Sequence, residues 1–136
     1  MSKCIYMTYC SKHKVENTAG GSNLFFPSQL YTSRRVQAFV RFCESHGYTW
    51  AIFSDQYGLV SDNEKIEWYN KPPNGVTDEE YESLLRDTII KLNGYDDVIF
   101  FYEYPTFHPL YRKLTNDLKQ HKRVVLTDSL ENWNVE

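Results

Sequence analysis

Four short apolar runs alternate with segments of helical periodicity, and this alternation constrains the fold more than any other feature of the chain. The apolar runs span residues 4–10, 48–53, 97–102 and 123–126. Between the first two runs, apolar side chains recur every three or four residues from Val36 to Cys43, which is typical of an amphipathic helix. Parallel strands need such crossover helices, and the crossovers are right-handed. The sequence therefore predicts an α/β protein.

The predicted architecture is a three-layer α/β/α sandwich on a four-stranded, mostly parallel sheet of strand order 2-1-3-4, which is Rossmann-like. The chain then reverses direction between strands 1 and 3, and a crevice forms there. We expect one helix that starts near Ser28 to Thr32 and ends at Gly47, one opened by a capping box at Thr77, and one capped by Thr106. The length of 136 residues fits a single domain.

The overall composition excludes some classes of protein. The net charge of −3 and the pI near 5.8 argue against a protein that coats nucleic acid through clustered positive charge. The cysteines Cys4, Cys10 and Cys43 are odd in number and form no CxxC, so we expect a reducing interior and neither a disulfide framework nor a cysteine zinc site.

Without a signal peptide or an apolar run of roughly 20 residues, a cytoplasmic location without membrane contact is expected. The histidines lack metal-ligand spacing, so no metal or cofactor is expected. The oligomeric state stays open.

Polar residues follow the first predicted strand directly. Cys10, Ser11 and Lys14 lie at this junction, where backbone N–H groups could bind an anion and Lys14 would add positive charge. A nearby lysine would also lower the pKa of Cys10 and favour its thiolate. The alternative is a buried structural cysteine beside a solvated lysine.

Two carboxylates follow predicted strands. Asp55, after the second strand, is the best candidate for a general base by its position, and Glu103, after the third strand, is the second. The alternative is that Asp55 only caps its loop and that Gly58 supplies a positive φ angle. The segment 55–76 is long for a connection in a compact domain, and such loops are more often functional or ordered by their own packing than idle.

Other side chains could face the same crevice. Tyr31 and Ser33 lie where we expect a first helical turn, although Ser33 is also a suitable helix cap. Arg34 or Arg35 could pair with a phosphate or a carboxylate. Tyr57, Trp68 and Tyr69 could stack on a base, and the commoner alternative is that they pack the long loop.

Several of these motifs carry a resemblance to a known family. They are Cys10-Ser11-x-x-Lys14, Leu30-Tyr31-x-Ser33, Phe53-Ser54-x-x-Tyr57-Gly58-Leu59-Val60 and Ile66-x-x-Tyr69. Over about its first half the chain resembles the YaaA-like proteins, in their small single-domain branch with a Tyr-Gly-Leu loop. It is also distantly similar to the uracil-DNA-glycosylase-like domain of archaeosine synthase. The resemblance implies a uracil-DNA-glycosylase-like fold and a link to nucleobase or nucleic-acid biology, but no reaction. Many relatives have Ser-Ala-Lys before the Tyr-Gly, where this chain has Ser54-Asp55-Gln56.

The first functional hypothesis is a pocket for a nucleobase, nucleoside or nucleotide at the carboxyl ends of the strands, with N-glycosidic cleavage or base transfer as the reaction. Asp55 and Glu103 are its catalytic candidates. Its ligand-binding candidates are Cys10, Ser11, Lys14, Tyr31, Ser33, Ser54, Tyr57, Gly58 and Tyr69. One alternative is a non-catalytic, nucleic-acid-binding or stress-linked accessory protein. The other is a protein-interaction domain with a tyrosine-rich face.

Overall fold

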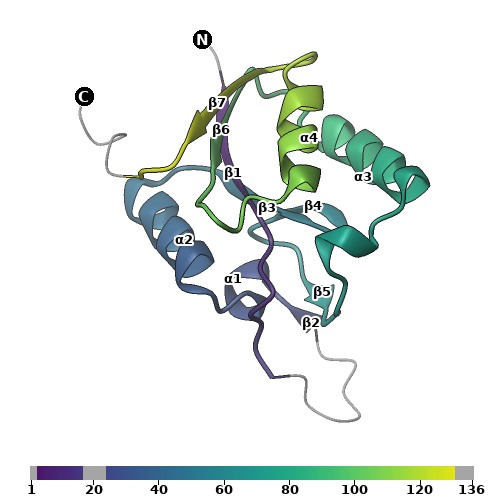
Figure 1. The fold of residues 1–136 in the computed structure, drawn as a ribbon. Coiled ribbons are helices and arrows are strands. Elements are labelled where there is room, and N and C mark those ends of the chain that lie inside the picture. Colours follow the sequence, from purple (N-terminus) through teal and green to yellow (C-terminus); the bar gives the residue numbers. More distant parts are fainter. Residues whose placement is uncertain (1–2, 17–23, 131–136) are drawn as a thin grey trace.

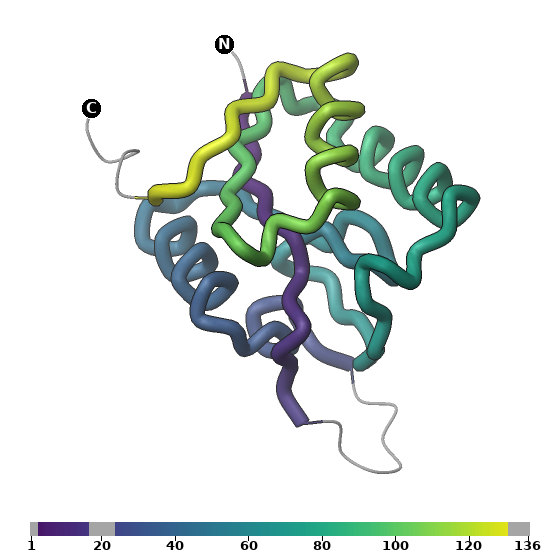
Figure 2. The backbone as a smooth tube through the Cα atoms, in the orientation of Figure 1, coloured from purple at the N-terminus to yellow at the C-terminus, as the bar shows by residue number. Residues whose placement is uncertain are grey.

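The first strand of the chain lies at the centre of the sheet. The computed structural model describes residues 3–16 and 24–130. The sheet consists of β1 (Cys4–Tyr9), β3 (Trp50–Ser54), β4 (Gly58–Ser61), β6 (Asp97–Phe101) and β7 (Arg123–Thr127). Their order is β4-β3-β1-β6-β7, and all neighbours are parallel except β4, which runs antiparallel to β3. Figure 2 shows β1 passing between strands that are formed much later in the sequence.

Helices cover both faces of the sheet (Figure 1). The longer helices are α2 (Arg34–His46), α3 (Asp78–Lys91) and α4 (Pro109–Leu118). Helix α2 packs on one face, and α3 and α4 pack on the other. The shorter elements are β2 (Leu24–Phe25), α1 (Pro27–Leu30), β5 (Ile66–Glu67) and the 3-10 turn η1 (Pro73–Gly75), with β2 and β5 forming a small antiparallel ribbon. The predicted α/β class is confirmed.

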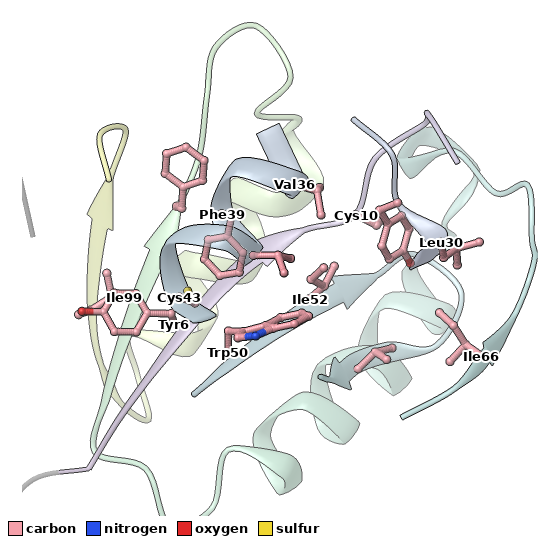
Figure 3. Packing of buried hydrophobic residues seen from close by; sticks show 14 of the residues in the cluster. Tyr6, Cys10, Leu30, Val36, Phe39, Cys43, Trp50, Ile52, Ile66 and Ile99 are labelled. Carbon is pink, nitrogen blue, oxygen red and sulfur yellow. The ribbon is translucent and has the colours of Figure 1, made fainter. Parts of the chain in front are cut away.

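Two apolar cores follow from the alternation of side chains along the strands. In β1, Tyr6 belongs to the core under α2, whereas Ile5 and Met7 belong to the core under α3 and α4. Figure 3 shows the first of these cores, in which Trp50 lies close to Phe39 of α2. Because β1 is covered on both faces, its near-continuous apolar sequence is the pattern expected of a central parallel strand.

The predicted count of four strands is wrong, and the order of the whole sheet differs from the predicted 2-1-3-4 because a fifth strand is present, while the four predicted strands keep their relative order. The four predicted strands form β3-β1-β6-β7, and β4 adds a fifth strand at the edge beside β3. The chain reverses between Ser54 and Gly58, which are paired, and the φ angle of Gly58 is 79°. Such tight hairpins favour glycine where φ is positive. The Ser54 hydroxyl accepts hydrogen bonds from the backbone N–H groups of Gln56 and Tyr57, which stabilises this turn.

Two predicted helix starts are also wrong. The expected first helix is interrupted: α1 ends at Leu30, Tyr31 is extended, and α2 begins after Ser33, whose hydroxyl accepts from the N–H of Val36 at 3.2 Å. Helix α4 is capped by His108 rather than Thr106. The capping box at Thr77 and the helix end at Gly47 are confirmed. Within residues 3–16 and 24–130, no helix has the length and apolarity to cross a membrane.

Candidate functional site

A cavity of about 500 Å³ lies at the carboxyl ends of β1 and β6. Its walls come from the segment after β1, the start of α2 and the segment that joins β6 to α4. Its volume lies in the range of about 300–1,000 Å³ that is usual for small-molecule sites. We call it the Arg35 cavity, after the buried cation in its wall.

Arg35 reaches the cavity from the first turn of α2 and is 7% exposed. Its guanidinium donates to the hydroxyl of Thr8 at 2.7 Å and to the carbonyl oxygen of Cys10 at 3.0 Å. Both acceptors are neutral and belong to the end of β1. Among the described residues, no carboxylate oxygen lies within 4.0 Å of the guanidinium. A buried positive charge without an anionic partner is costly, so this group is prepared to receive an anion.

The surroundings of Arg35 change its pKa but leave it positively charged. Burial lowers the pKa of Arg35 from its usual value, and the nearby ionisable groups, among them Glu103, oppose that shift. Its central carbon also lies 3.8 Å from the ring centroid of Tyr9, in a cation–π contact. An arginine keeps its charge even when its pKa falls somewhat, so the guanidinium remains a cation at neutral pH.

Glu103 also lines the cavity, and Tyr9 fixes its backbone. The Tyr9 hydroxyl donates to the carbonyl oxygen of Glu103 at 3.1 Å and accepts from its N–H at 3.1 Å. The hydroxyl of Thr106 lies 2.9 Å from that of Tyr9 and also donates to the Glu103 carbonyl. These hydrogen bonds therefore hold the backbone of Glu103, in the segment after β6, against Tyr9 of β1.

Aromatic rings form much of the remaining wall. Tyr9 stacks on Tyr111 of α4 with ring centroids 4.5 Å apart, and on Phe107 at 5.8 Å. All three residues line the cavity, together with His108. Lys12 and His13 contribute further polar groups from the segment after β1. The cavity therefore combines aromatic surface with cationic and hydrogen-bonding groups.

Asp55 lies behind this wall rather than in it. It is 2% exposed, and its two carboxylate oxygens lie 2.9 and 3.0 Å from the hydroxyl of Tyr111. Burial raises the pKa of Asp55, and hydrogen bonds from Tyr111 and Cys10 and the charges of Lys14 and His108 oppose that rise. Asp55 is not among the described residues that line the Arg35 cavity. It therefore contacts the cavity through residues that line it, Tyr111 and Cys10.

Cys10 lines the cavity but is not activated. It is 5% exposed, and its sulfur lies 3.6 Å from the Tyr111 hydroxyl. Burial, reinforced by the charge of Asp55, raises the pKa of Cys10 to about 11. The expectation that Lys14 lowers this pKa is therefore wrong, because the loss of hydration outweighs the distant ammonium.

The other predicted ligand residues form a packed group beside Asp55. The hydroxyls of Tyr31 and Tyr69 lie 2.6 Å apart, and the Lys14 ammonium lies 4.5 Å from the ring centroid of Tyr69. Tyr57 contacts Tyr69 edge to face and donates to the carbonyl oxygen of Glu67 at 3.3 Å. Burial lowers the pKa of Lys14. These rings order the segment between β3 and α3, which is the packing alternative that the sequence left open.

The predicted residues therefore divide between two places. Glu103, Cys10, Ser11 and Ser33 line the Arg35 cavity. Asp55, Lys14, Tyr31, Ser54, Tyr57, Gly58 and Tyr69 do not line it. No group of three or more His, Cys, Asp or Glu side chains that could hold a metal ion occurs in the described part of the chain.

The sequence hypotheses did not include the main cation of the cavity in the ligand-binding set. From the sequence, Arg35 is given no place on the core face of its helix and is named only beside Arg34, as an arginine that could pair with a phosphate or a carboxylate. It lies instead on the buried face, four residues before Phe39, which is 0% exposed. An arginine at this spacing from core residues is the signal that could have identified it. The sequence does not mark Tyr9, Phe107 and Tyr111 as cavity residues in the same way. Their apolar spacing predicts only that they belong to the core.

The fold and the cavity define an α/β protein with a buried cation at the carboxyl ends of its central strands. The comparison with protein families adds that the chain belongs to a family of unknown function, DUF6884, whose model matches residues 5–101. Arg35 lies inside the matched segment, whereas Glu103 and α4 lie beyond it. Neither the curated proteins nor the solved structures contain a match to the chain.

Proposed function

We propose that the Arg35 cavity binds a nucleotide through its phosphate group and that Glu103 acts on the N-glycosidic bond of this ligand. The observation that carries the proposal is the guanidinium of Arg35, which is buried, lines the cavity and has only neutral acceptors in Thr8 and Cys10. The resemblance to YaaA-like and uracil-DNA-glycosylase-like proteins agrees with this ligand class and stays a prediction.

A phosphate suits this cation better than a single neutral group does. Thr8 and Cys10 accept hydrogen bonds from two of the N–H groups of Arg35, and an arginine carries five. The remaining donors form the planar fork that binds phosphate oxygens, and charge-assisted bonds of this kind are about twice as strong as neutral ones. Pro105, Phe107 and Pro109 add apolar groups to the lining, which a base could contact and a bare inorganic anion would not need.

The proposed reaction is hydrolysis of the N-glycosidic bond. A water oxygen bonds to C1′ of the sugar, the bond from C1′ to the base nitrogen breaks, and the base leaves with a proton. A carboxylate assists by accepting the proton of the water and by stabilising positive charge on the sugar. Glu103 lines the cavity and has a fixed backbone, so we assign it this role. Asp55, the first candidate from the sequence, instead orients Tyr111.

The binding proposal can be tested by isothermal titration with a nucleobase, its nucleoside and its nucleoside 5′-monophosphate. We expect the monophosphate to bind at least about tenfold more tightly than the nucleoside, because a charge-assisted bond is gained. Arg35→Gln should abolish this preference, whereas Arg34→Gln, which changes an exposed neighbour, should keep it. Arg35→Lys keeps the charge and serves as the second variant if Arg35→Gln melts early.

Equal affinity of the wild type for nucleoside and monophosphate would contradict the proposal. Binding confined to oligonucleotides, and weakened by salt, would favour the alternative of a non-catalytic nucleic-acid-binding accessory protein. A stable complex with another protein and no nucleotide binding would favour the interaction-domain alternative.

The reaction is tested separately, by chromatographic detection of free base from the bound nucleotide. Glu103→Gln should abolish base release while it leaves the affinity for the monophosphate within about threefold, since the charge of Arg35 remains. Base release that persists in Glu103→Gln would remove Glu103 from this role. We also propose a cytoplasmic location, which the free thiols of Cys4, Cys10 and Cys43 support.

A further inference from the structure

Glu103 belongs to two hollows of the surface. Besides the Arg35 cavity, it lines a shallower groove of about 570 Å³, which we call the Arg41 groove. The groove lies between α2 and the segments that follow β6 and β7. Arg35 and Arg41 both belong to α2, and each lines a different one of the two hollows that share Glu103.

The groups in the Arg41 groove are those that a second nucleoside with its phosphate would use. Arg41 is exposed, and among the described residues no carboxylate oxygen lies within 4.0 Å of its guanidinium, so it is open to a phosphate. Asp128 can accept hydrogen bonds from ribose hydroxyls, as carboxylates do in dinucleotide sites. Phe42 and Leu130 supply apolar surface.

The wall that carries Asp128 is held in place by the chain itself. The hydroxyl of Thr127 donates to the carbonyl oxygen of Ser129 at 2.9 Å and accepts from its N–H at 3.2 Å. The carbonyl oxygen of Thr127 in turn accepts from the N–H of Tyr102, next to Glu103, at 3.0 Å. The end of β7 and the end of β6 therefore keep a fixed spacing across the groove.

We propose that the ligand is a dinucleotide, with one nucleotide half in the Arg35 cavity and the other in the Arg41 groove. This inference rests on the proposed nucleotide function and extends it by naming the ligand class. Glu103, which lines both hollows, then borders the sugar of the half in the Arg35 cavity, and the two arginines bind the two phosphates of the ligand. The acidic net charge of the protein agrees with a compact ligand held by two specific cations, rather than with a long polyanion.

The test is isothermal titration of the full chain with a nucleoside monophosphate and with the dinucleotide in which two such nucleosides are joined through a diphosphate. We expect the dinucleotide to bind at least about tenfold more tightly, because it adds a charge-assisted contact. Arg41→Gln should reduce the dinucleotide affinity to that of the monophosphate and leave the monophosphate affinity unchanged. Arg34→Gln, an exposed arginine of α2 outside both sets of lining residues, should change neither.

The outcomes separate this inference from the function on which it rests. Tight monophosphate binding without any gain for the dinucleotide overturns the inference and leaves the proposed function in place. An Arg41→Gln variant that weakens both ligands equally also overturns it. Affinity that keeps growing with the length of a single-stranded oligonucleotide overturns it in favour of nucleic acid. Absence of binding to both small ligands overturns the inference and the proposed function together.

Discussion

The hydroxyl of Tyr111 lies within 3.0 Å of both carboxylate oxygens of Asp55, so a residue that lines the Arg35 cavity is held by a carboxylate behind it. Tyr111 faces the cavity on one side and stacks on Tyr9, whose hydroxyl holds the backbone of Glu103. A carboxylate that does not line the cavity is thus connected to one that does. The connection consists of two tyrosines from β1 and α4, so it depends on the packing of both elements.

The first prediction concerns the pH dependence of stability. The pKa of Asp55 is raised by burial, so the folded state holds this proton more tightly than the unfolded state, whose value is near 3.8. The resulting stabilisation is complete below pH 3.8 and is lost as the pH rises through the folded pKa. Relative to Asp55→Asn, the wild type should therefore lose free energy of unfolding over this interval. Urea titrations of both proteins at several pH values measure the difference, and parallel curves would contradict it.

The second prediction concerns the thiols. Raising the pKa of Cys10 from 9.0 to about 11 reduces its thiolate fraction at pH 8. Two pH units correspond to about 100-fold less of the reactive form. Burial raises the pKa of Cys43 to about 12 and also raises that of Cys4. The folded protein should resist iodoacetamide, whereas the urea-unfolded protein should gain three adducts by mass spectrometry. Rapid modification of folded Cys10 would show that this account of its environment is incorrect.

The third prediction separates backbone strain from side-chain contact at Gly58. Its φ angle is 79°, and a Cβ atom there would lie 2.6 Å from a carboxylate oxygen of Asp87. Gly47 has a φ angle of 69° and nothing within 4 Å of such an atom. Gly47→Ala should cost about 1–2 kcal/mol of stability for the left-handed conformation alone, and Gly58→Ala should cost more.

The added cost at Gly58 should disappear when Asp87 is shortened. In an Asp87→Ala background, Gly58→Ala should destabilise the protein by about as much as Gly47→Ala does, because only the backbone term remains. Denaturant unfolding of the wild type, the three single variants and the double variant provides the comparison. Equal costs for the two glycine substitutions in the wild-type background would mean that Asp87 moves aside freely.

The fourth prediction concerns the hydroxyl pair of Tyr31 and Tyr69, which are 2.6 Å apart and buried. Tyr31→Phe or Tyr69→Phe leaves one buried hydroxyl without this partner, at a cost of about 1–3 kcal/mol. The double variant should cost less than the sum of the two single variants. Tyr57→Phe, which removes a longer and exposed hydrogen bond, should change the stability little. Strict additivity in the double-mutant cycle would rule out coupling between the hydroxyls.

The sequence predicted the elements whose signal is local. The central strands β1, β3 and β6 were predicted because each is an apolar run between polar segments. Strand β4 was missed because it has four residues and returns directly from β3 through a tight turn, so its sequence resembles a loop. The break at Tyr31 was missed because it depends on pairing with Lys14, which local periodicity does not encode.

From the sequence, a cavity residue could be predicted only when its position at the end of a strand is enough to place it in the cavity. Glu103 and Cys10 line the cavity because they follow β6 and β1, and parallel strands end at one edge of the sheet. Asp55 follows β3 and lies near the same edge, but its side chain is directed behind Tyr111. The burial of Arg35 depends on acceptors from a different element. Side-chain direction and such distant partners follow from tertiary packing, so patterns within one segment do not reveal them.

The central place of β1 also constrains how the chain can fold during synthesis. Thr8 of this strand donates a hydrogen bond to the carbonyl oxygen of Phe101, which is 93 residues further along the chain. Contacts between such distant segments slow folding, because a long loop must close before they form. During synthesis β1 therefore leaves the ribosome well before β6, and the middle of the sheet stays open on one side until β6 has emerged. Until then the backbone N–H and C=O groups on the β6 side of β1 are unpaired, and such an open strand edge favours misassociation of the nascent chain.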